Sequence, residues 1–169
     1  MSPHQLSWRD ALPSVLAGLL FIGQMVYGFF VSTASQQEVL AWIGIAVFVC
    51  SGFFGMAPVV IFPKKGGVDK GNSFVHTTQL VTTGLYAVIR HPQYSTFFYW
   101  NVGAMLLFQD WVVVLLGIAA MILTYGDMMR EDERNIKKFG KNYTTYMKQV
   151  PRANWVVGLI RLWRRSQNS

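Results

Sequence analysis

Four apolar blocks, separated by shorter polar segments, form the dominant pattern along this chain of 169 residues. The first two blocks are Leu12–Ser32 and Glu38–Phe62. Each is long enough to cross a hydrocarbon core, since about 20 helical residues span roughly 30 Å. We therefore predict two membrane-spanning helices. The first is too long for the apolar region of a signal peptide, about 7–15 residues, so we expect it to be an uncleaved span.

The third and fourth blocks, Pro92–Phe108 and Trp111–Tyr125, are separated only by Gln109 and Asp110. This short connection predicts a tight helical hairpin. Each arm has about 16 residues and would be about 24 Å long as a helix, which is short for a full crossing. The preceding segment, Pro63–Thr83, is polar and contains several glycines, so we predict no long helix there.

Beyond the fourth block the chain is polar, but apolar residues recur at steps of three and four between residues 136 and 150. The spacing predicts one amphipathic helix whose apolar face is formed by Ile136, Phe139, Tyr143, Tyr146 and Val150. Such a helix would lie on the membrane surface or close over a site as a lid. The basic, aromatic tail WVVGLIRLWRR that follows is expected at the membrane interface.

Composition favours an integral membrane protein. Hydrophobic residues make up 52% of the chain and charged residues only 14%, whereas about 25% is typical of soluble domains. The net charge of +7 does not indicate a nucleic-acid-binding protein, because the cations flank apolar blocks instead of lining one polar face. We predict an all-α polytopic membrane protein with four to five transmembrane helices. Residues 1–169 would form a single membrane domain, with two N-terminal spans in 1–62 and a core with the hairpin and an amphipathic C-terminal helix in 63–169.

The distribution of charge predicts the orientation in the membrane. If the N-terminus is cytoplasmic, all 15 Lys and Arg residues lie on the cytoplasmic side. The two outer loops then carry only Glu38 and Asp110. This distribution follows the positive-inside rule, so we predict that both termini are cytoplasmic.

Familiar metal and nucleotide motifs are missing from the sequence. The single cysteine, Cys50, excludes an intramolecular disulfide, and no Cys/His cluster indicates zinc. We expect Cys50 to be a small buried apolar residue. The chain has neither GxGxxG with alternating strands and helices nor GxxxxGK[ST], so neither a Rossmann site nor a P-loop is predicted.

Two polar clusters are expected to meet at the cytoplasmic ends of the hairpin. The cluster that precedes or begins the third block comprises Tyr86, Arg90, His91 and Tyr94. The cluster that follows the fourth block comprises Glu131, Asp132 and Glu133. An ordinary membrane interface also accounts for these residues, because Arg and Tyr anchor at lipid headgroups and acids at a solvated helix can pair with Arg130 and Arg134.

The order of motifs carries a resemblance. Three motifs follow one another in the chain: GLYAVIRHPQY, the acid pair ED and FGKNYTTYMKQVPR. Their order resembles that of the isoprenylcysteine carboxyl methyltransferases, which belong to a wider group that includes the phospholipid methyltransferases. The resemblance covers about residues 76–152. It implies an S-adenosyl-L-methionine site unlike the Rossmann type, with S-adenosyl-L-homocysteine as product, and a catalytic core in residues 63–169.

The resemblance also assigns residues. It implies cofactor contacts from Thr78, Gln79, Leu80, Val81, Tyr86, His91, Pro92, Gln93, Tyr94 and Glu131, and catalytic positions at Arg130 and Glu131. Two positions depart from the family pattern. Asp132 replaces the second Glu of the acid pair, and Asp127 stands where the family has a substrate-side arginine, so Arg130 is the nearest basic residue.

The residue types fit the chemistry of this cofactor. A carboxylate such as Glu131 can bind its ammonium group by a charge-assisted hydrogen bond, and His91 or Arg90 can meet its carboxylate. Tyrosine rings suit the adenine and the sulfonium. A carboxylate acceptor is already ionised, whereas an amine acceptor would first need a base.

We therefore predict an S-adenosylmethionine-dependent methyltransferase that acts on a lipophilic methyl acceptor in the bilayer, most simply by carboxyl O-methylation of a prenylcysteine-type substrate. One alternative is a phospholipid or small-amphiphile N-methyltransferase. Another is a sterol-reductase-like membrane oxidoreductase, although its pattern places Glu soon after the Tyr of RHPxY, where this chain has residues 95–97, Ser-Thr-Phe. A non-enzymatic membrane scaffold is the third, and it leaves the combined motifs unexplained.

Overall fold

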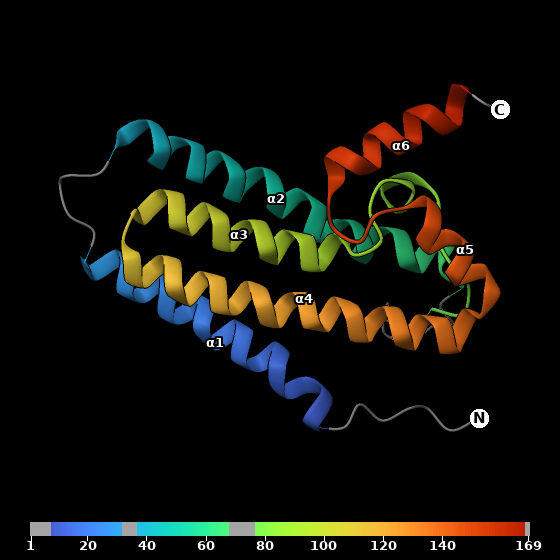
Figure 1. The fold of residues 1–169 in the computed structure, drawn as a ribbon, viewed down its shortest axis with the longest axis horizontal. Coiled ribbons are helices and arrows are strands. Elements are labelled where there is room, and N and C mark those ends of the chain that lie inside the picture. The colour runs from blue at the N-terminus through green and yellow to red at the C-terminus, as the bar shows by residue number, and fades with distance from the viewer. Residues whose placement is uncertain (1–7, 32–36, 68–76, 168–169) are drawn as a thin grey trace. The chain divides into compact units, whose positions relative to one another are not determined.

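The computed structural model describes residues 8–31, 37–67 and 77–167 (Figure 1). Within these ranges every regular element is a helix, which confirms the prediction of an all-α protein. The helices are α1 (Trp8–Val31), α2 (Glu38–Lys65), the short 3-10 helix η1 (Gly84–Ala87), α3 (Pro92–Phe108), α4 (Trp111–Phe139), α5 (Lys141–Gln149) and α6 (Trp155–Gln167).

Three of these helices are long and apolar enough to cross a membrane: α1 from Ala11, α2 and α4. The helices predicted for the first two apolar blocks and the bounds of α3 are confirmed. With 17 residues, α3 is about 25 Å long, shorter than a typical hydrocarbon core. The total of four to five transmembrane helices stays a prediction.

The end of α4 differs from the sequence prediction. The fourth block was expected to end at Tyr125, but the helix continues through polar residues to Phe139. Residues 127–139 include several Met, Arg, Glu and Lys residues, which favour helices, and contain no glycine or proline. The expectation of a short arm therefore holds for α3 and is wrong for α4.

The chain divides into two compact units, each of which takes part of α2, α3 and α4. Unit 1 comprises Met1–Ser51 and Phe97–Met129, and unit 2 comprises Gly52–Thr96 and Arg130–Ser169. The single membrane domain predicted from the sequence stays a prediction.

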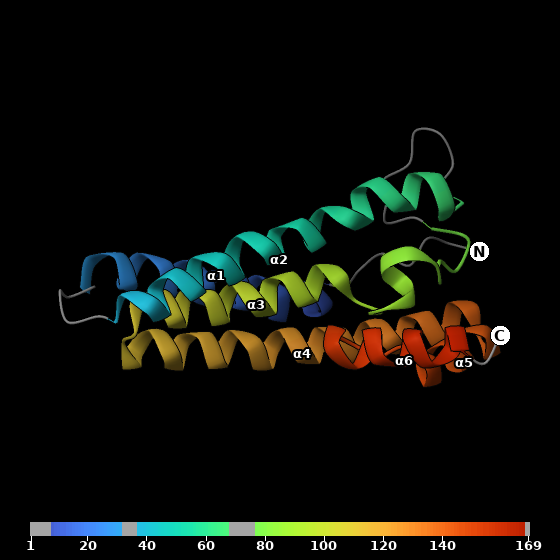
Figure 2. The same ribbon diagram turned by 90° about the horizontal axis from the view of Figure 1, so that it is seen from above.

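In unit 1, helical segments of α1, α2, α3 and α4 lie side by side (Figures 1 and 2). A core cluster of Ala104, Phe108 and Val113 packs against Met25, Tyr27 and Leu107. The backbones of α2 and α3 approach closely at Gly44, where an added Cβ would lie 2.6 Å from the carbonyl oxygen of Gly103. Small residues allow such close contact between membrane helices.

Polar side chains also join the helices of unit 1. Gln24 of α1 is fully buried, and its Nε2 donates to the carbonyl oxygens of Asn101 on α3 (3.3 Å) and Val113 on α4 (3.1 Å). The Ser14 hydroxyl donates to the Asp127 carboxylate at 2.7 Å. Side-chain hydrogen bonds of this kind join helices where no water can compete.

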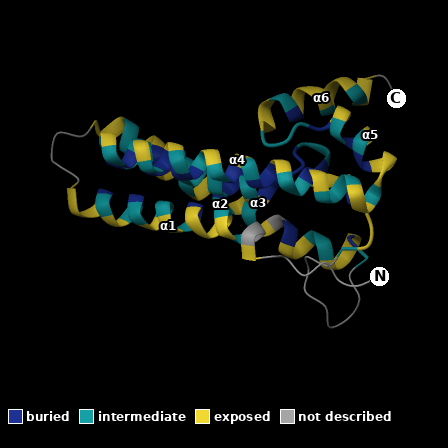
Figure 3. Ribbon diagram, turned by 60° about the horizontal axis from the view of Figure 1, so that its bottom comes forward, coloured by how far each residue is buried: buried dark blue, intermediate teal, exposed yellow. Residues whose placement is uncertain are grey.

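Large apolar side chains cover much of the outer surface of α1 and α2, where Figure 3 shows exposed residues in yellow. On α1 they include Leu19, Ile22, Phe29 and Phe30, which are 58–79% exposed. A lipid environment accounts for such surfaces, which water-soluble proteins rarely expose. Cys50 lies among the exposed residues of α2, so its predicted burial is wrong.

In unit 2, the predicted amphipathic helix over 136–150 is broken. Its first residues end α4, and Gly140 separates them from α5 with a φ of +57°, a left-handed conformation that favours glycine. The predicted apolar face is nevertheless a core: Tyr143, Tyr146 and Val150 are buried and pack against Leu80, Ile136, Phe139 and Met147. This face thus packs inside unit 2, so a membrane-surface position for it is wrong.

Candidate active site

All residues assigned to a site by the sequence lie in unit 2. The segment Thr78–Val81 is a loop, and Tyr86 lies in η1. His91 directly precedes α3, whose first turn contains Pro92, Gln93 and Tyr94. Proline is favoured in the first turn of a helix, where its missing N–H has no partner to lose. Arg130 and Glu131 lie on α4.

The most highly connected group in this region is Asp132, which is 2% exposed. Its Oδ2 accepts hydrogen bonds from Arg90 Nη2 at 3.0 Å and from Arg152 Nε at 2.9 Å. Its Oδ1 accepts from the Tyr143 hydroxyl at 2.6 Å and pairs with His91 Nε2 at 2.7 Å. We refer to these five residues as the Asp132 cluster.

The charges of the Asp132 cluster are unequal. Two arginines and a histidine surround one carboxylate, so the cluster is positive overall. Burial, together with the hydrogen bond to Asp132 and its negative charge, raises the pKa of the Tyr143 phenol above its usual range. Tyr143 therefore stays protonated and acts as a donor. The Nε of Arg90 is buried and has no hydrogen-bond partner among the described residues.

Backbone hydrogen bonds hold the two halves of the cluster together. The N–H groups of Arg90 and His91 donate to the carbonyl oxygens of Pro151 (3.1 Å) and Arg152 (3.2 Å). The Tyr146 hydroxyl donates to the carbonyl oxygen of Tyr86 at 2.6 Å. The RHP segment and the VPR segment are therefore paired directly, although the paired residues are 61 positions apart in the chain.

Glu131 has a different environment from its neighbour Asp132. Its Oε2 accepts from Arg134 Nε at 3.1 Å, and its Oε1 accepts from Asn135 Nδ2 at 3.2 Å. The Glu131 side chain is 32% exposed. Consecutive residues on a helix point about 100° apart, which explains why one acid is buried and the other is accessible.

The remaining predicted residues surround these groups in different ways. Thr78 donates to the carbonyl oxygen of Gly67 at 2.6 Å, and Tyr86 stacks on Phe62 with ring centroids 5.1 Å apart. The Tyr94 ring meets the His91 ring edge to face at 5.8 Å. Val81 and Pro92 are buried, Leu80 and Arg130 are partly buried, and Gln79 and Gln93 are exposed.

Sequence reasoning missed the importance of three residues. It treated Asp132 as a mild departure from the family pattern, Tyr143 as a member of an apolar face and Arg152 as part of a motif without a role. A usable signal was present, because an acid inside a family motif that is rich in Arg and Tyr needs partners when it is buried. Its partners, however, lie up to 42 residues away in the chain.

Comparison with known proteins connects this site to a family. Residues 72–138 match the model of the isoprenylcysteine carboxyl methyltransferase (ICMT) family. Protein-S-isoprenylcysteine O-methyltransferase B of Arabidopsis thaliana is 27% identical over 110 residues, 58% of this chain and 56% of that protein. Protein-S-isoprenylcysteine O-methyltransferase of Xenopus laevis is 33% identical over 100 residues, 54% of this chain and 35% of that protein.

The human protein-S-isoprenylcysteine O-methyltransferase is 32% identical over 97 residues, 52% of this chain and 34% of that protein. This chain thus spans between about a third and just over half of the length of these relatives. No solved structure matches. The segment 72–138, which holds every site residue predicted from the sequence, therefore matches the isoprenylcysteine carboxyl methyltransferase family, and the resemblance is confirmed.

Proposed function

We propose that this chain is an S-adenosylmethionine-dependent methyltransferase that methylates the carboxylate of a prenylcysteine-type, lipid-linked acceptor. The observation that carries the proposal is the overlap between the segment that matches the family and the candidate site. The segment that matches the family also contains the residues proposed to bind the cofactor, together with Arg90, His91 and Asp132 of the buried cluster. The names of the relatives, all protein-S-isoprenylcysteine O-methyltransferases, support the choice of acceptor.

The residues fit the charged groups of the cofactor. Glu131 is accessible and can accept hydrogen bonds from an ammonium group. The Asp132 cluster is positive overall and contains Arg90 Nε, which has no hydrogen-bond partner among the described residues, so its surroundings suit a carboxylate. The Tyr94 ring, half-buried beside His91, suits a sulfonium or an adenine ring. When bound, the cofactor supplies an electrophilic methyl group.

Within this proposal, the chain contributes binding and orientation. Asp132 fixes the ring of His91 through Nε2 and the guanidinium of Arg90, and Tyr143 stays protonated beside them. His91 would therefore line the site in a fixed orientation, because its Nε2 is already paired with Asp132. A carboxylate acceptor needs no proton removed at neutral pH, so positioning of the reactants and exclusion of water supply the rate enhancement.

The acceptor carboxylate needs a cation, and we assign this role to Arg130, which lies on α4 directly before Glu131. The position of the family's substrate-side arginine is occupied by Asp127. Asp127 is 4% exposed and accepts a hydrogen bond from Ser14, so it joins α1 to α4 within unit 1. A buried acid of this kind is a structural contact and not a substitute for the arginine.

Methyl transfer to defined acceptors tests the proposal. The purified full chain would be incubated with methyl-labelled S-adenosylmethionine and either N-acetyl-S-farnesylcysteine or phosphatidylethanolamine in the same detergent. Base-labile label on the farnesylcysteine is the expected result. Label on the amine alone would replace the proposal by phospholipid N-methylation. A nicotinamide cofactor that co-purifies with the chain would favour the oxidoreductase alternative.

We also propose that both termini and the cofactor site are cytoplasmic, because that orientation places all 15 cations on one side. After Cys50→Ala, a cysteine at Ser166 should be protected from an impermeant thiol reagent in intact cells. A cysteine at Gln109 should be labelled. The reverse result would invert the orientation.

A further inference from the structure

The C-terminal helix α6 presents two chemically different faces. Its large apolar side chains are exposed: Trp155, Val156, Leu159, Ile160 and Trp163 are 42–64% exposed. Arg161, Arg164 and Arg165 lie at spacings of three and four residues and therefore share another face. A helix with exposed aromatic residues on one side and arginines on the other is typical of elements at a membrane interface.

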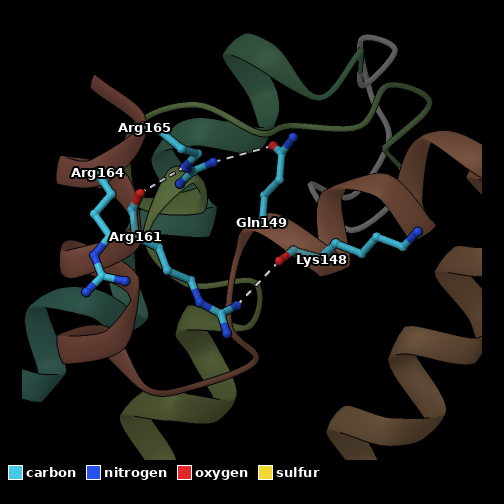
Figure 4. Close-up of a pocket in the computed structure, with 5 residues that line it drawn as sticks. All are labelled: Lys148, Gln149, Arg161, Arg164 and Arg165. Carbon is cyan, nitrogen blue, oxygen red and sulfur yellow. Dashed lines mark hydrogen bonds between the residues drawn. The ribbon is translucent and has the colours of Figure 1, made fainter. Parts of the chain in front are cut away.

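The arginine face of α6 borders a hollow of about 390 Å³, shared with the end of α5. Figure 4 shows Arg161 and Arg165 reaching from α6 toward Lys148 and Gln149. Arg161 Nη1 donates to the Lys148 carbonyl oxygen at 3.5 Å, and Arg165 Nη1 donates to Gln149 Oε1 at 3.4 Å. The Lys148 side chain points away from the arginines, so the guanidinium groups supply the positive charge of the hollow.

Arg161 and Arg164 keep donors for a ligand. A guanidinium has five N–H groups, and Arg161 uses one of them in the contact with Lys148. Both Arg161 and Arg164 are exposed. Residues 134–169 include nine Lys and Arg residues and no Asp or Glu, so this part of the sequence supplies no acid to balance them.

A third side of α6 packs against the chain at Ala87 and Val88. An added Cβ at Gly158 would lie 2.0 Å from the carbonyl oxygen of Val88, so the two backbones are in direct contact. Arg165 Nη2 donates to the carbonyl oxygen of Ala87 at 2.8 Å. Within unit 2, α6 is therefore held in place while its apolar face and most of its arginine face remain exposed.

We propose that the hollow lined by Arg161, Arg164, Arg165 and Gln149 binds the phosphate group of an anionic phospholipid. A planar guanidinium matches phosphate oxygens with paired hydrogen bonds. The exposed Trp155, Leu159 and Trp163 select a lipid over a soluble phosphate or an acidic protein, because they need an apolar partner beside the anion. This site goes beyond the proposed methyl transfer and does not depend on it.

Lipid retention by the full chain tests the site. The protein would be purified in detergent and titrated with phosphatidylglycerol or phosphatidylcholine, and bound lipids would be counted by native mass spectrometry. The test variant is Arg161→Gln/Arg164→Gln, which leaves the Arg165 contact with Ala87 intact. The control is Lys137→Gln/Lys141→Gln, which removes the same charge from two exposed positions elsewhere in unit 2.

The chain should retain phosphatidylglycerol in preference to phosphatidylcholine. The arginine variant should lose about thirtyfold in affinity for phosphatidylglycerol, on the basis of about fivefold per cation near an anionic surface, and the lysine variant should lose far less. Equal losses in the two variants would overturn the site in favour of diffuse attraction. Displacement of the lipid by millimolar glycerol phosphate would overturn the lipid assignment.

A second variant tests the apolar half of the site. Trp163→Ser removes an exposed side chain and leaves every arginine in place. It should weaken retention of phosphatidylglycerol while binding of inorganic phosphate is unchanged. Unaltered lipid retention would overturn the role of the apolar face, and the thermal unfolding temperature of each variant shows that the fold is retained.

Discussion

Two buried polar groups, Gln24 in unit 1 and Asp132 in unit 2, are stabilised by different means. In unit 1, Gln24 is neutral and donates to two backbone carbonyl oxygens between apolar helices. In unit 2, Asp132 is charged and accepts from Arg90, Arg152, His91 and Tyr143. A neutral amide joins helices at small cost, whereas a buried ion is tolerated only with all its partners in place. The comparison implies that loss of the Gln24 contacts is tolerated better than loss of the ion pairs of Asp132.

The largest effect is expected from Asp132→Asn. The amide keeps the shape of the side chain but leaves Arg90 and Arg152 without their acid, and breaking a buried ion pair costs about 3–5 kcal/mol. The free energy of unfolding in detergent measures this loss, and methyl transfer should also be lost. The control Glu133→Gln removes an exposed acid one residue away and should change stability by less than about 0.5 kcal/mol. Equal losses would refute the special role of Asp132.

The variant Glu131→Gln tests the role of the accessible acid independently of the buried Asp132. We expect it to weaken cofactor binding about 10- to 150-fold, from the loss of a charge-assisted hydrogen bond of about 1.5–3 kcal/mol, with little change in stability. Calorimetric titration with S-adenosylhomocysteine measures the affinity. Unchanged binding would make Glu131 a solvated acid that only pairs with Arg134.

Gly44→Ala tests the close packing of unit 1. The new methyl group would lie 2.6 Å from the Gly103 carbonyl oxygen, so backbones must separate, at a cost of about 1–3 kcal/mol. Gly18→Ala in α1 is the matched control, because no atom of the residues that the structure describes lies within 4 Å of the added Cβ. Unfolding of both variants in the same detergent should show a loss for Gly44→Ala alone. Identical stabilities would indicate that α2 and α3 adjust freely.

Gln24→Leu is expected to have the smallest effect. It removes two hydrogen bonds but also a buried oxygen, Gln24 Oε1, for which the described part of the chain offers no partner, so we expect a loss of about 0.6 and at most about 1.7 kcal/mol. The same unfolding measurement applies. A loss as large as that of Asp132→Asn would remove the distinction between the two buried groups.

Local signals in the sequence mark the starts of α3 and α4. Pro92 marks the start of α3, and Asp110 caps α4, since its Oδ1 accepts from the N–H groups of Val112 (2.8 Å) and Val113 (3.3 Å). The break at Gly140 was harder to predict, because the apolar spacing continues across it and both sides of the break contribute to the same core.

Local signals did not predict which residues of the candidate site are buried. Motifs identified residues 90–94 and 131 as candidate site residues. The sequence gives no signal, however, for which of the neighbouring acids Glu131 and Asp132 is buried. Whether Glu131 or Asp132 is buried depends on the rotation of α4 against segments far away in the chain. Likewise, exposure of Cys50 depends on which side of α2 faces its neighbours, and an all-round apolar helix carries no signal for this.

The separation of 42 residues between Arg90 and Asp132 has a consequence for biosynthesis. At about 5–20 residues per second, a ribosome adds Arg90 and His91 about 2–8 s before their acid. Tyr143 and Arg152 follow Asp132 within 20 residues, so they join it soon afterwards. During the interval Arg90 carries its positive charge directly before the apolar helix α3 and has not yet met its partner Asp132. Water or lipid phosphates can solvate this single charge until Asp132 emerges.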